Sequence, residues 1–316
     1  MSSGLLTSAV GSLELRSPLL TGSGTFGHDP AAALRFLGPE DLGAHVLKTV
    51  TPRPRTGNPP PRLVETPAGL LNSIGLENRG LAWFLEEVAP QHREAPWPVV
   101  GNAGGESVEE FVEVVAAFGA EPALAAIEIN LSCPNVQGGA LPFSTSPEAV
   151  GEVVAACRAA TDKPLWAKLS PNVTRIAPLA RAAEEAGADA LTVCNTLLGL
   201  VVDWRRRRPA LGQGMGGLSG PAIRPVALRL VWECRQAVGL PIVASGGVSS
   251  AEDVLQFLVA GASAVQVGSY CFRRPDGIRR IAGDLRRLLA EEGCRVRELV
   301  GSLRWPGGGA AGGGEG

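Results

Sequence analysis

Eight short apolar runs, separated by stretches with helical periodicity, are the feature of this sequence that most constrains its fold. The runs span residues 18–24, 45–51, 98–104, 125–133, 164–171, 190–196, 241–247 and 264–270. Helical periodicity covers residues 106–118, 147–161, 176–186, 221–238 and 251–260. Strands that alternate with helices in this way are typical of an α/β protein, and eight of them predict a (β/α)₈ TIM barrel.

Three segments lie outside this alternation. Residues 5–15 turn at Gly11 and predict an N-terminal β-hairpin that closes the bottom of the barrel. Residues 52–71 hold six prolines, too many for a helix, and predict a stiff proline-rich insertion after strand 2. Residues 306–316 are Gly-rich and predict a disordered tail. Because no linker divides the rest, residues 1–305 are expected to form a single domain.

Charge and cysteine content narrow the classes of partner. The net charge is −2, so no basic field attracts nucleic acid or an anionic membrane, and a small-molecule ligand is expected. The six cysteines form no C-x-x-C pair and do not combine with the three histidines at metal-ligand spacing, so no metal site is predicted. The sequence has no signal peptide and no long apolar run, which indicates a reducing, cytoplasmic setting.

Lysine is rare in this chain, which makes its positions informative. Only three of the 29 basic residues are lysines, and the others are arginines. Lys48 and Lys168 interrupt apolar runs, where an unpaired charge would be costly, whereas Lys163 fits an ordinary loop. The two strand lysines are therefore candidate functional residues.

Polar side chains gather where the predicted strands end. In an α/β barrel the catalytic groups project from the carboxyl ends of the strands. Those ends carry Ser23, Gly24, Lys48, Thr49, Asn102, Asn130, Cys133, Lys168, Asn195, Thr196, Gly246, Gly247, Gly268 and Ser269. Asn135 lies just beyond the fourth strand, and Asn72 lies in the proline-rich insertion. This placement predicts a ligand site at one end of the barrel.

Glycines at the ends of strands 7 and 8 indicate a phosphate site. Gly246-Gly247 precedes a capped helix and Gly268-Ser269 follows the last strand, so backbone N–H groups at both places can face a phosphate. A single Gly-Gly pair is also compatible with a tight turn. Two such sites together predict a phosphate-bearing cofactor, and Lys168 could stabilise negative charge on its ring system.

Cys133 lies in a loop that follows a predicted buried strand, within the segment Asn130-Leu131-Ser132-Cys133-Pro134-Asn135. Its thiol can serve as a proton-transfer group or a nucleophile, and the neighbouring amides suit a flat ligand that forms hydrogen bonds. The alternative is a small buried thiol beside a turn. A second ambiguous segment is Arg205–Arg208, which fits either a solvated loop or a patch that docks a partner or attracts anions.

Six motifs of this chain form a recognisable series: residues 57–62 (GNPPPR), 71–78 (LNSIGLEN), 130–135 (NLSCPN), 168–172 (KLSPN), 194–196 (CNT) and 217–223 (GLSGPAI). In their order and spacing, over about residues 5–272, the chain resembles the class 1 dihydroorotate dehydrogenases. Residues 65–72 (ETPAGLLN) resemble the class 1B catalytic subunit more than class 1A. Cys133 matches the base of class 1, whereas class 2 uses serine.

The resemblance implies that the chain oxidises (S)-dihydroorotate to orotate in de novo pyrimidine (UMP) biosynthesis, with FMN at the top of the barrel. Cys133 would take the C5 proton while a hydride passes from C6 to FMN, assisted by Lys48. The implied FMN contacts are Ser23, Lys48, Thr49, Asn102, Asn130, Lys168, Cys194, Gly220, Gly246, Gly247, Gly268 and Ser269. The implied substrate contacts are Lys48, Asn72, Ser73, Ile74, Gly75, Leu76, Asn130, Asn135, Asn195 and Thr196. Cys194 departs from the aliphatic residue usual there.

Class 1B also implies a partner. Its catalytic subunits form a homodimer core and pass electrons to NAD⁺ through a second subunit with FAD and a [2Fe–2S] cluster, which makes a heterotetramer. The absence of a cysteine cluster here fits that division but also fits class 1A, a homodimer that uses fumarate. A non-catalytic FMN-binding barrel is the remaining alternative.

Overall fold

A computed structural model describes residues 4–131 and 145–306 of the chain. Its centre is a sheet of eight strands in the spatial order β3-β16-β15-β10-β9-β8-β7-β4, with every neighbouring pair parallel. The strands are β3 (Leu19–Thr21), β4 (His45–Val46), β7 (Val99–Ala103), β8 (Ala126–Asn130), β9 (Leu165–Lys168), β10 (Ala190–Val193), β15 (Ile242–Ser245) and β16 (Ala264–Val267). A parallel bridge from Leu20 to Ala44 closes the sheet beside β4. The predicted (β/α)₈ barrel is confirmed.

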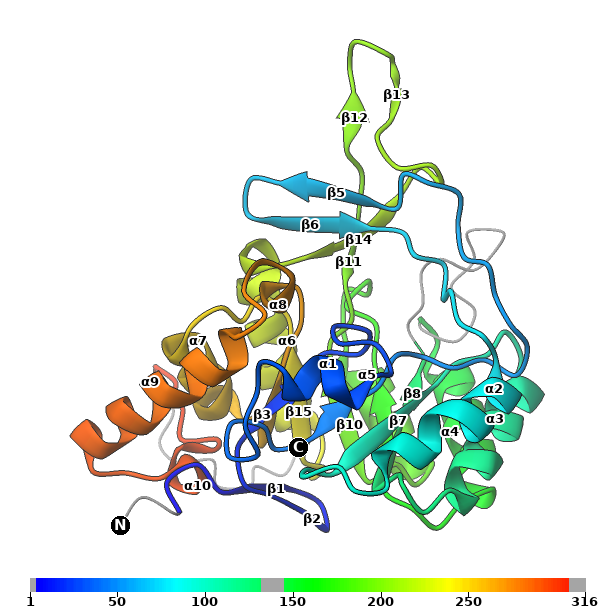
Figure 1. Ribbon diagram of the computed structural model, residues 1–316. Coiled ribbons are helices and arrows are strands. Elements are labelled where there is room, and N and C mark those ends of the chain that lie inside the picture. Colours follow the sequence, from blue (N-terminus) through cyan, green and yellow to red (C-terminus); the bar gives the residue numbers. More distant parts are fainter. Residues whose placement is uncertain (1–3, 132–144, 307–316) are drawn as a thin grey trace, which may run out of the picture.

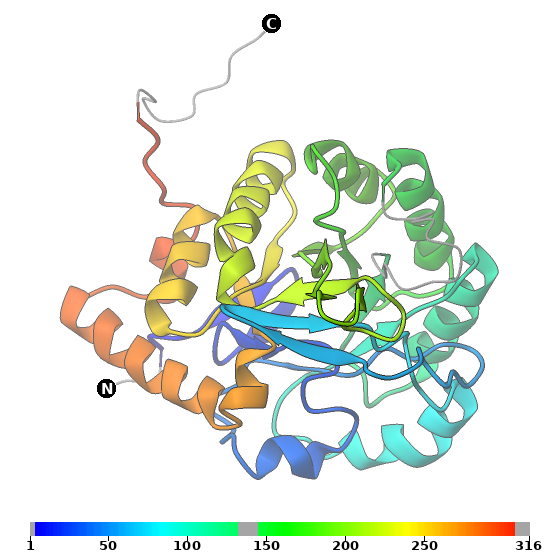
Figure 2. The ribbon, with the colours of Figure 1, turned by 90° about the horizontal axis from the view of Figure 1, so that it is seen from above.

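Helices surround this barrel, as the view from above shows (Figure 2). They are α1 (Pro30–Leu34), α2 (Leu81–Trp83), α3 (Val108–Ala120), α4 (Pro147–Ala159), α5 (Ala177–Glu185), α6 (Arg224–Ala237), α7 (Ala251–Ala260), α8 (Tyr270–Arg273), α9 (Gly277–Glu292) and α10 (Val296–Leu299). Short π and 3₁₀ turns are η1 (Phe84–Val88), η2 (Ala89–His92) and η3 (Pro221–Ile223). The five predicted helices lie within a few residues of α3 to α7. The sequence analysis did not predict α9, although its apolar residues repeat at helical spacing.

Helix α3 illustrates why these segments form helices and why they pack against the barrel. Ser107 caps its first turn by accepting a hydrogen bond from the Glu110 N–H. The buried residues of the helix are Phe111, Val114, Val115 and Phe118, which fall on one face at spacings of three and four. That face belongs to the large apolar core between the helices and the outer face of the barrel.

A second, smaller core fills the lower part of the barrel interior. Trp166 is its largest member and is fully buried, and side chains from the other strands surround it. Above Trp166 on the same face of β9 lies Lys168, because side chains two residues apart share a face of a strand. The interior therefore changes from apolar to polar toward the carboxyl ends of the strands.

The N-terminal hairpin lies under the barrel, as predicted (Figure 1). Strands β1 (Ser8–Val10) and β2 (Leu13–Leu15) pair in antiparallel register, Ser8 with Leu15. Gly11 makes the turn with a φ of 59°. The buried side chains of Val10 and Leu15 join the small core inside the barrel, so the hairpin covers its lower opening.

A four-stranded antiparallel sheet lies over the opposite end of the barrel (Figure 1). Its order is β11 (Leu197–Gly199), β14 (Gly216–Ser219), β6 (Gly69–Asn72) and β5 (Leu63–Thr66). The proline-rich insertion thus contains a hairpin in its second half, after its clustered prolines, and β6 pairs with β14 from another loop. The sequence predicted the insertion but not this sheet.

Above that sheet, the hairpin of β12 (Val202–Asp203) and β13 (Arg208–Pro209) projects away from the barrel (Figure 1). Arg205–Arg208 are exposed at its tip, and the Asp203 carboxylate accepts hydrogen bonds from the backbone N–H groups of Arg205 and Arg206. The Arg205 guanidinium lies 4.5 Å from the centre of the Trp204 ring. The arginine run is therefore solvated, and its role in docking stays a prediction.

The part of the chain that the structure describes holds neither a membrane-spanning helix nor a cluster of metal ligands. No helix of residues 4–131 and 145–306 has both the length and the apolar character needed to cross a membrane. In the same residues, no group of three or more histidine, cysteine or acidic side chains is arranged to hold a metal ion.

Candidate active site

A cavity of about 450 Å³ opens at the carboxyl ends of the barrel strands. Its volume falls within the range of small-molecule and cofactor sites. Its lining comes from the ends of β3, β8, β9, β10, β15 and β16, from the segment after β4, and from the four-stranded sheet above. The barrel therefore forms the floor and walls of the cavity, and the insertion forms part of its roof.

One wall of the cavity is built from glycine-rich backbone. Gly247 follows β15 with a φ of 80°, and a Cβ added there would lie 2.7 Å from the Arg224 Cβ and 2.9 Å from the Gly220 oxygen. Gly220 has a φ of 97°, and an added Cβ would lie 2.6 Å from the Gly69 Cα. Side chains are excluded from both positions. Together with Gly268 and Ser269, this backbone leaves room for an anionic group such as a phosphate.

Behind the glycine-rich wall, a capped helix holds the loop in place. Asp253 is buried in the first turn of α7 and accepts hydrogen bonds from the N–H groups of Ser249 and Ser250. The Ser250 hydroxyl in turn accepts from the Asp253 N–H, which completes a capping box. The Arg224 guanidinium pairs with the same carboxylate. These contacts fix the loop that carries Gly246 and Gly247.

The cavity floor is cationic. Lys168 at the end of β9 is 6% exposed and lines the cavity, and its Nζ lies 3.2 Å from Glu128 Oε1 and 3.3 Å from Gln266 Oε1. Lys48 lines the cavity from the segment after β4 and is half-buried. The cost of an unpaired charge in the barrel is avoided for Lys168, whose partner is Glu128 on the neighbouring strand.

Glu128 is the centre of a buried polar layer under the cavity. Its carboxylate is fully buried and accepts hydrogen bonds from Asn102 at 2.6 Å, Thr192 at 2.7 Å and Gln266 at 2.6 Å, in addition to Lys168. The sequence analysis missed Glu128, Thr192 and Gln266. A charged residue in the apolar run of β8, two residues before Asn130 and on the same face, was the signal that could have revealed it.

A line of hydrogen bonds leads from this layer to the cavity. Asn102 accepts from the Thr49 hydroxyl at 2.5 Å, and that hydroxyl accepts from the Asn130 amide at 3.4 Å. Asn130 Oδ1 accepts from the Asn195 amide at 3.3 Å, and Asn195 Oδ1 accepts from the Thr196 N–H at 2.8 Å. Amide groups that bond their neighbours in this way present fixed donors and acceptors to a ligand.

The roof is more apolar than the floor. Leu63 and Leu70 of the overlying sheet and Phe272 of α8 line the cavity, and they were not predicted, because single apolar residues carry no local signal of a ligand site. Asn72 lies at the end of β6 and donates from Nδ2 to the Gly217 oxygen at 3.2 Å. This hydrogen bond ties the insertion to β14 directly over the cavity.

Most residues that the sequence predicted for the site meet in this cavity. Those that line it are Ser23, Lys48, Thr49, Asn72, Ile74, Gly75, Leu76, Asn130, Lys168, Cys194, Asn195, Thr196, Gly220, Gly246, Gly247, Gly268 and Ser269. Asn102 lies below the floor, bonded to Glu128 and Thr49. Ser73 is buried inside the insertion, where its hydroxyl accepts from the Asn58 amide at 2.7 Å. Cys133 and Asn135 lie outside the described residues.

The described cysteines are poor candidates for a base. Burial raises the pKa of Cys194, which lines the cavity, to about 12, and the positive charge of Lys168 opposes this only in part. Burial raises the pKa of Cys157 and of Cys271 to about 12 as well. Thiols with such pKa values are protonated at neutral pH. None of the three can therefore accept a proton from a substrate under these conditions.

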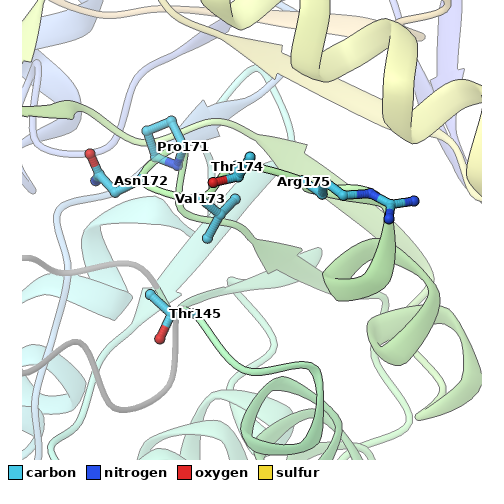
Figure 3. A pocket seen from close by; sticks show the side chains of 6 residues that line it. All are labelled: Thr145, Pro171, Asn172, Val173, Thr174 and Arg175. Carbon is cyan, nitrogen blue, oxygen red and sulfur yellow. The ribbon is translucent and has the colours of Figure 1, made fainter.

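A separate hollow of about 610 Å³ opens on the surface beside β9 (Figure 3). It is lined by Thr145, Pro171, Asn172, Val173, Thr174 and Arg175. Figure 3 shows the Arg175 side chain pointing away from Thr145, so the lining does not converge on a common point. The hollow lacks the lysines and the glycine-rich backbone of the strand-end cavity, so we place the functional site in the strand-end cavity.

Comparison with known proteins identifies the family of this chain. Residues 5–289 match the family described as dihydroorotate dehydrogenase. The chain is 48% identical to the catalytic subunit of dihydroorotate dehydrogenase B (NAD(+)) from Trichlorobacter lovleyi, covering 93% of this chain and 97% of that protein. It is also 48% identical to the protein of the same name from Pelobacter propionicus, covering 94% and 98%.

A solved structure shows the same fold. The dihydroorotate dehydrogenase of Eimeria tenella, crystallised with ferulenol, aligns with a TM-score of 0.79 at 24% identity, covering 94% of this chain and 88% of that one. At that identity the likeness concerns the fold alone. The family match and the two bacterial relatives carry the assignment, and this chain belongs to the dihydroorotate dehydrogenase family.

Proposed function

We propose that this chain is the catalytic subunit of a class 1B dihydroorotate dehydrogenase, which oxidises (S)-dihydroorotate to orotate in pyrimidine biosynthesis with FMN as cofactor. The observation that carries the proposal is the strand-end cavity, which combines a glycine-rich wall, a buried lysine and a line of oriented amides. The names of the near-full-length bacterial relatives support the same activity and an NAD⁺-linked electron acceptor.

The cavity fits FMN at both of its ends. Gly246, Gly247, Gly268 and Ser269 would hold the phosphate with their backbone N–H groups, in the space that the glycine-rich wall leaves open. Lys168, Thr49 and Asn130 would face the flavin ring, together with Ser23 and Cys194. Asn102 would act from below, through Thr49. When bound, FMN supplies the acceptor for the two electrons that leave the substrate.

The other side of the cavity suits a flat pyrimidine with a carboxylate. Asn72, Asn130, Asn195 and Thr196 would bind its amides and carboxylate, and Asn135 would join them from outside the described residues. Residues 74–76 would pack against the ring, and the buried Ser73 would support them from behind. The Lys48 ammonium would attract the carboxylate and stabilise charge that develops on the substrate.

Cys133 is proposed as the base that removes the C5 proton. The high pKa values of the described cavity and core thiols leave them unsuited to this task. A thiol base at neutral pH needs a pKa lower than the ordinary value of about 8.5, or a substrate proton made more acidic by its surroundings. Lys48 would contribute to the second effect by stabilising negative charge on the substrate.

The Cys133 assignment is tested by Cys133→Ser, with Cys294→Ser as the control. Cys294 is half-buried and lies near the end of α9, away from the cavity. Cys133→Ser should retain FMN. When dihydroorotate is added at neutral pH without oxygen, its rate of flavin reduction should be about 10²- to 10⁴-fold lower than that of the wild type. Cys294→Ser should behave like the wild type. An unchanged rate in Cys133→Ser would remove that thiol as the base.

The proposed assembly is a homodimer core with a second subunit that carries FAD and a [2Fe–2S] cluster and reduces NAD⁺. Co-purification with absorbance spectroscopy tests it directly, because the chain alone should show FMN bands and the complex should add FAD and iron–sulfur bands. The chain alone should not reduce NAD⁺. If the chain instead reduced fumarate efficiently without a partner, the class 1A alternative would replace class 1B. If dihydroorotate never bleached the yellow protein, the chain would be a non-catalytic FMN-binding barrel.

A further inference from the structure

We propose that Glu128 is a positioning residue, which holds the Lys168 ammonium at the cavity floor and sets the direction of the hydrogen bonds that reach Asn130. The proposal rests on FMN binding in this cavity, as proposed above. It concerns a residue that does not itself line the cavity.

The Glu128 carboxylate is enclosed by hydrogen-bond donors. It is fully buried, and its two oxygens accept hydrogen bonds from side chains on β7, β9, β10 and β16. An ion pair taken out of water rarely adds stability compared with apolar residues of the same volume. The barrel interior directly below is apolar around Trp166, so an apolar layer could have been continued upward. A charged layer immediately under the ligand cavity therefore indicates a role toward the ligand.

The Lys168 ammonium is held from below by two acceptors. Its Nζ has one acceptor on Glu128 and another on Gln266, both in the layer below. An ammonium has three N–H donors, so the third can point into the cavity that Lys168 lines. Gln266 also donates to Glu128 at 2.6 Å, which orients its amide so that its oxygen faces Lys168. Glu128 thus fixes the ammonium both directly and through Gln266.

The hydrogen bonds that run from Glu128 to Asn130 have a fixed direction from donor to acceptor. The Glu128 carboxylate only accepts, so Asn102 must turn its amide nitrogen to it and its oxygen to Thr49. The Thr49 proton is then used, and the hydroxyl oxygen accepts from the Asn130 amide, which leaves Asn130 Oδ1 to accept from Asn195. A neutral amide in place of the carboxylate could donate as well as accept. The direction of the whole line would then no longer be fixed.

Glu128→Gln tests both effects. Since the negative charge that partly neutralises Lys168 is removed, bound FMN should favour its reduced, anionic form, and the ratio of affinities for reduced and oxidised FMN should rise on the order of tenfold. The ratio follows from the midpoint potentials of bound and free FMN. In a Lys168→Met background, the same Glu128→Gln change should leave the ratio almost unaltered. An equal rise in both backgrounds would overturn the claim that Glu128 acts through Lys168.

Thr192→Val provides a second variant of similar volume outside the cavity. It removes one donor from Glu128, which makes the carboxylate a stronger acceptor for Lys168, so the affinity ratio should fall severalfold, opposite in sign to Glu128→Gln. Opposite shifts support the proposal, whereas shifts of the same sign indicate a merely structural role and overturn it. If Glu128→Gln does not fold, Thr192→Val tests the proposal alone: a severalfold fall of the affinity ratio supports it, and an unchanged or higher ratio overturns it.

The flavin-free protein separates this inference from the proposed function. In a double-mutant cycle of Glu128→Gln and Lys168→Met, the two residues should be coupled by a factor on the order of tenfold in the unfolding equilibrium constant. A wild-type chain that binds no FMN would remove the proposed function, while the cycle still tests the pair. Additive effects in the cycle would overturn the pairing itself.

Discussion

The three histidines of this chain predict a specific loss of stability in acid, and His45 carries the clearest case. His45 lies in β4, is fully buried, and has no hydrogen-bond partner for either ring nitrogen within the described residues. Its ring contacts His92 and Trp97, with centroid distances of 5.8 and 6.4 Å. Burial, with smaller contributions from His92 and His28, lowers the pKa of His45 from 6.5 to about 3.

The sign and size of the effect follow from this shift. In the folded chain His45 stays neutral down to about pH 3, whereas in the unfolded chain it binds a proton below about pH 6.5. His45 therefore does not lower the free energy of unfolding above pH 6.5, and it lowers this free energy progressively as the pH falls from 6.5 toward 3. Between pH 7 and pH 5 the loss in the free energy of unfolding is about 2 kcal/mol for this residue alone. His28, whose pKa is lowered to about 4 by burial first and then by Lys48, acts in the same direction.

The assay is urea unfolding of the flavin-free protein at pH 7 and pH 5, so that ligand binding does not contribute. His45→Met, which has a similar volume and no titrating group, should lose about 2 kcal/mol less than the wild type over this interval. Leu42→Met, another buried substitution, should lower stability by the same amount at both pH values. Equal acid losses in His45→Met and the wild type would refute the reasoning.

Three further variants test the walls and floor of the cavity. Lys168→Ala should weaken FMN binding or make bound FMN harder to reduce, and unchanged flavin content and reduction potential would contradict its role. Gly247→Ala should add about 1–3 kcal/mol of backbone strain and weaken FMN binding at least about tenfold in a fluorescence titration, since its φ is 80°; an unchanged Kd would contradict the phosphate assignment. Asp253→Asn should lower the free energy of unfolding, measured in urea, by about 2 kcal/mol, because Arg224 and the Ser249 and Ser250 N–H groups lose their charged acceptor. A loss under about 0.5 kcal/mol would contradict that arrangement.

The barrel could be predicted from the sequence because its signals are local. Each strand is a short apolar run with a polar or glycine end, and parallel strands place those ends at one edge. The same rule brought Lys168 and Asn130 together, which pair in register across β8 and β9. The second barrel strand was predicted too long, as 45–51 rather than the two residues of β4, because the chain continues to bond β7 irregularly through Val50.

The roof of the cavity could not be predicted in the same way. Asn72 pairs in register with Gly217, 145 residues along the chain, and no local pattern reports such a pairing. Glu128 escaped notice for a different reason. The strand-end rule covers only the last residues of each strand, whereas its carboxylate lies two residues deeper and contacts Lys168 from below.

The central claim is that dihydroorotate reduces a flavin held in the strand-end cavity of this chain. Rapid anaerobic mixing of the purified yellow chain with (S)-dihydroorotate tests it most directly, with the flavin absorbance followed in time. We expect the yellow colour to bleach and orotate to form in equal amount to the flavin reduced. A flavin that stays oxidised in the presence of excess dihydroorotate would contradict the claim.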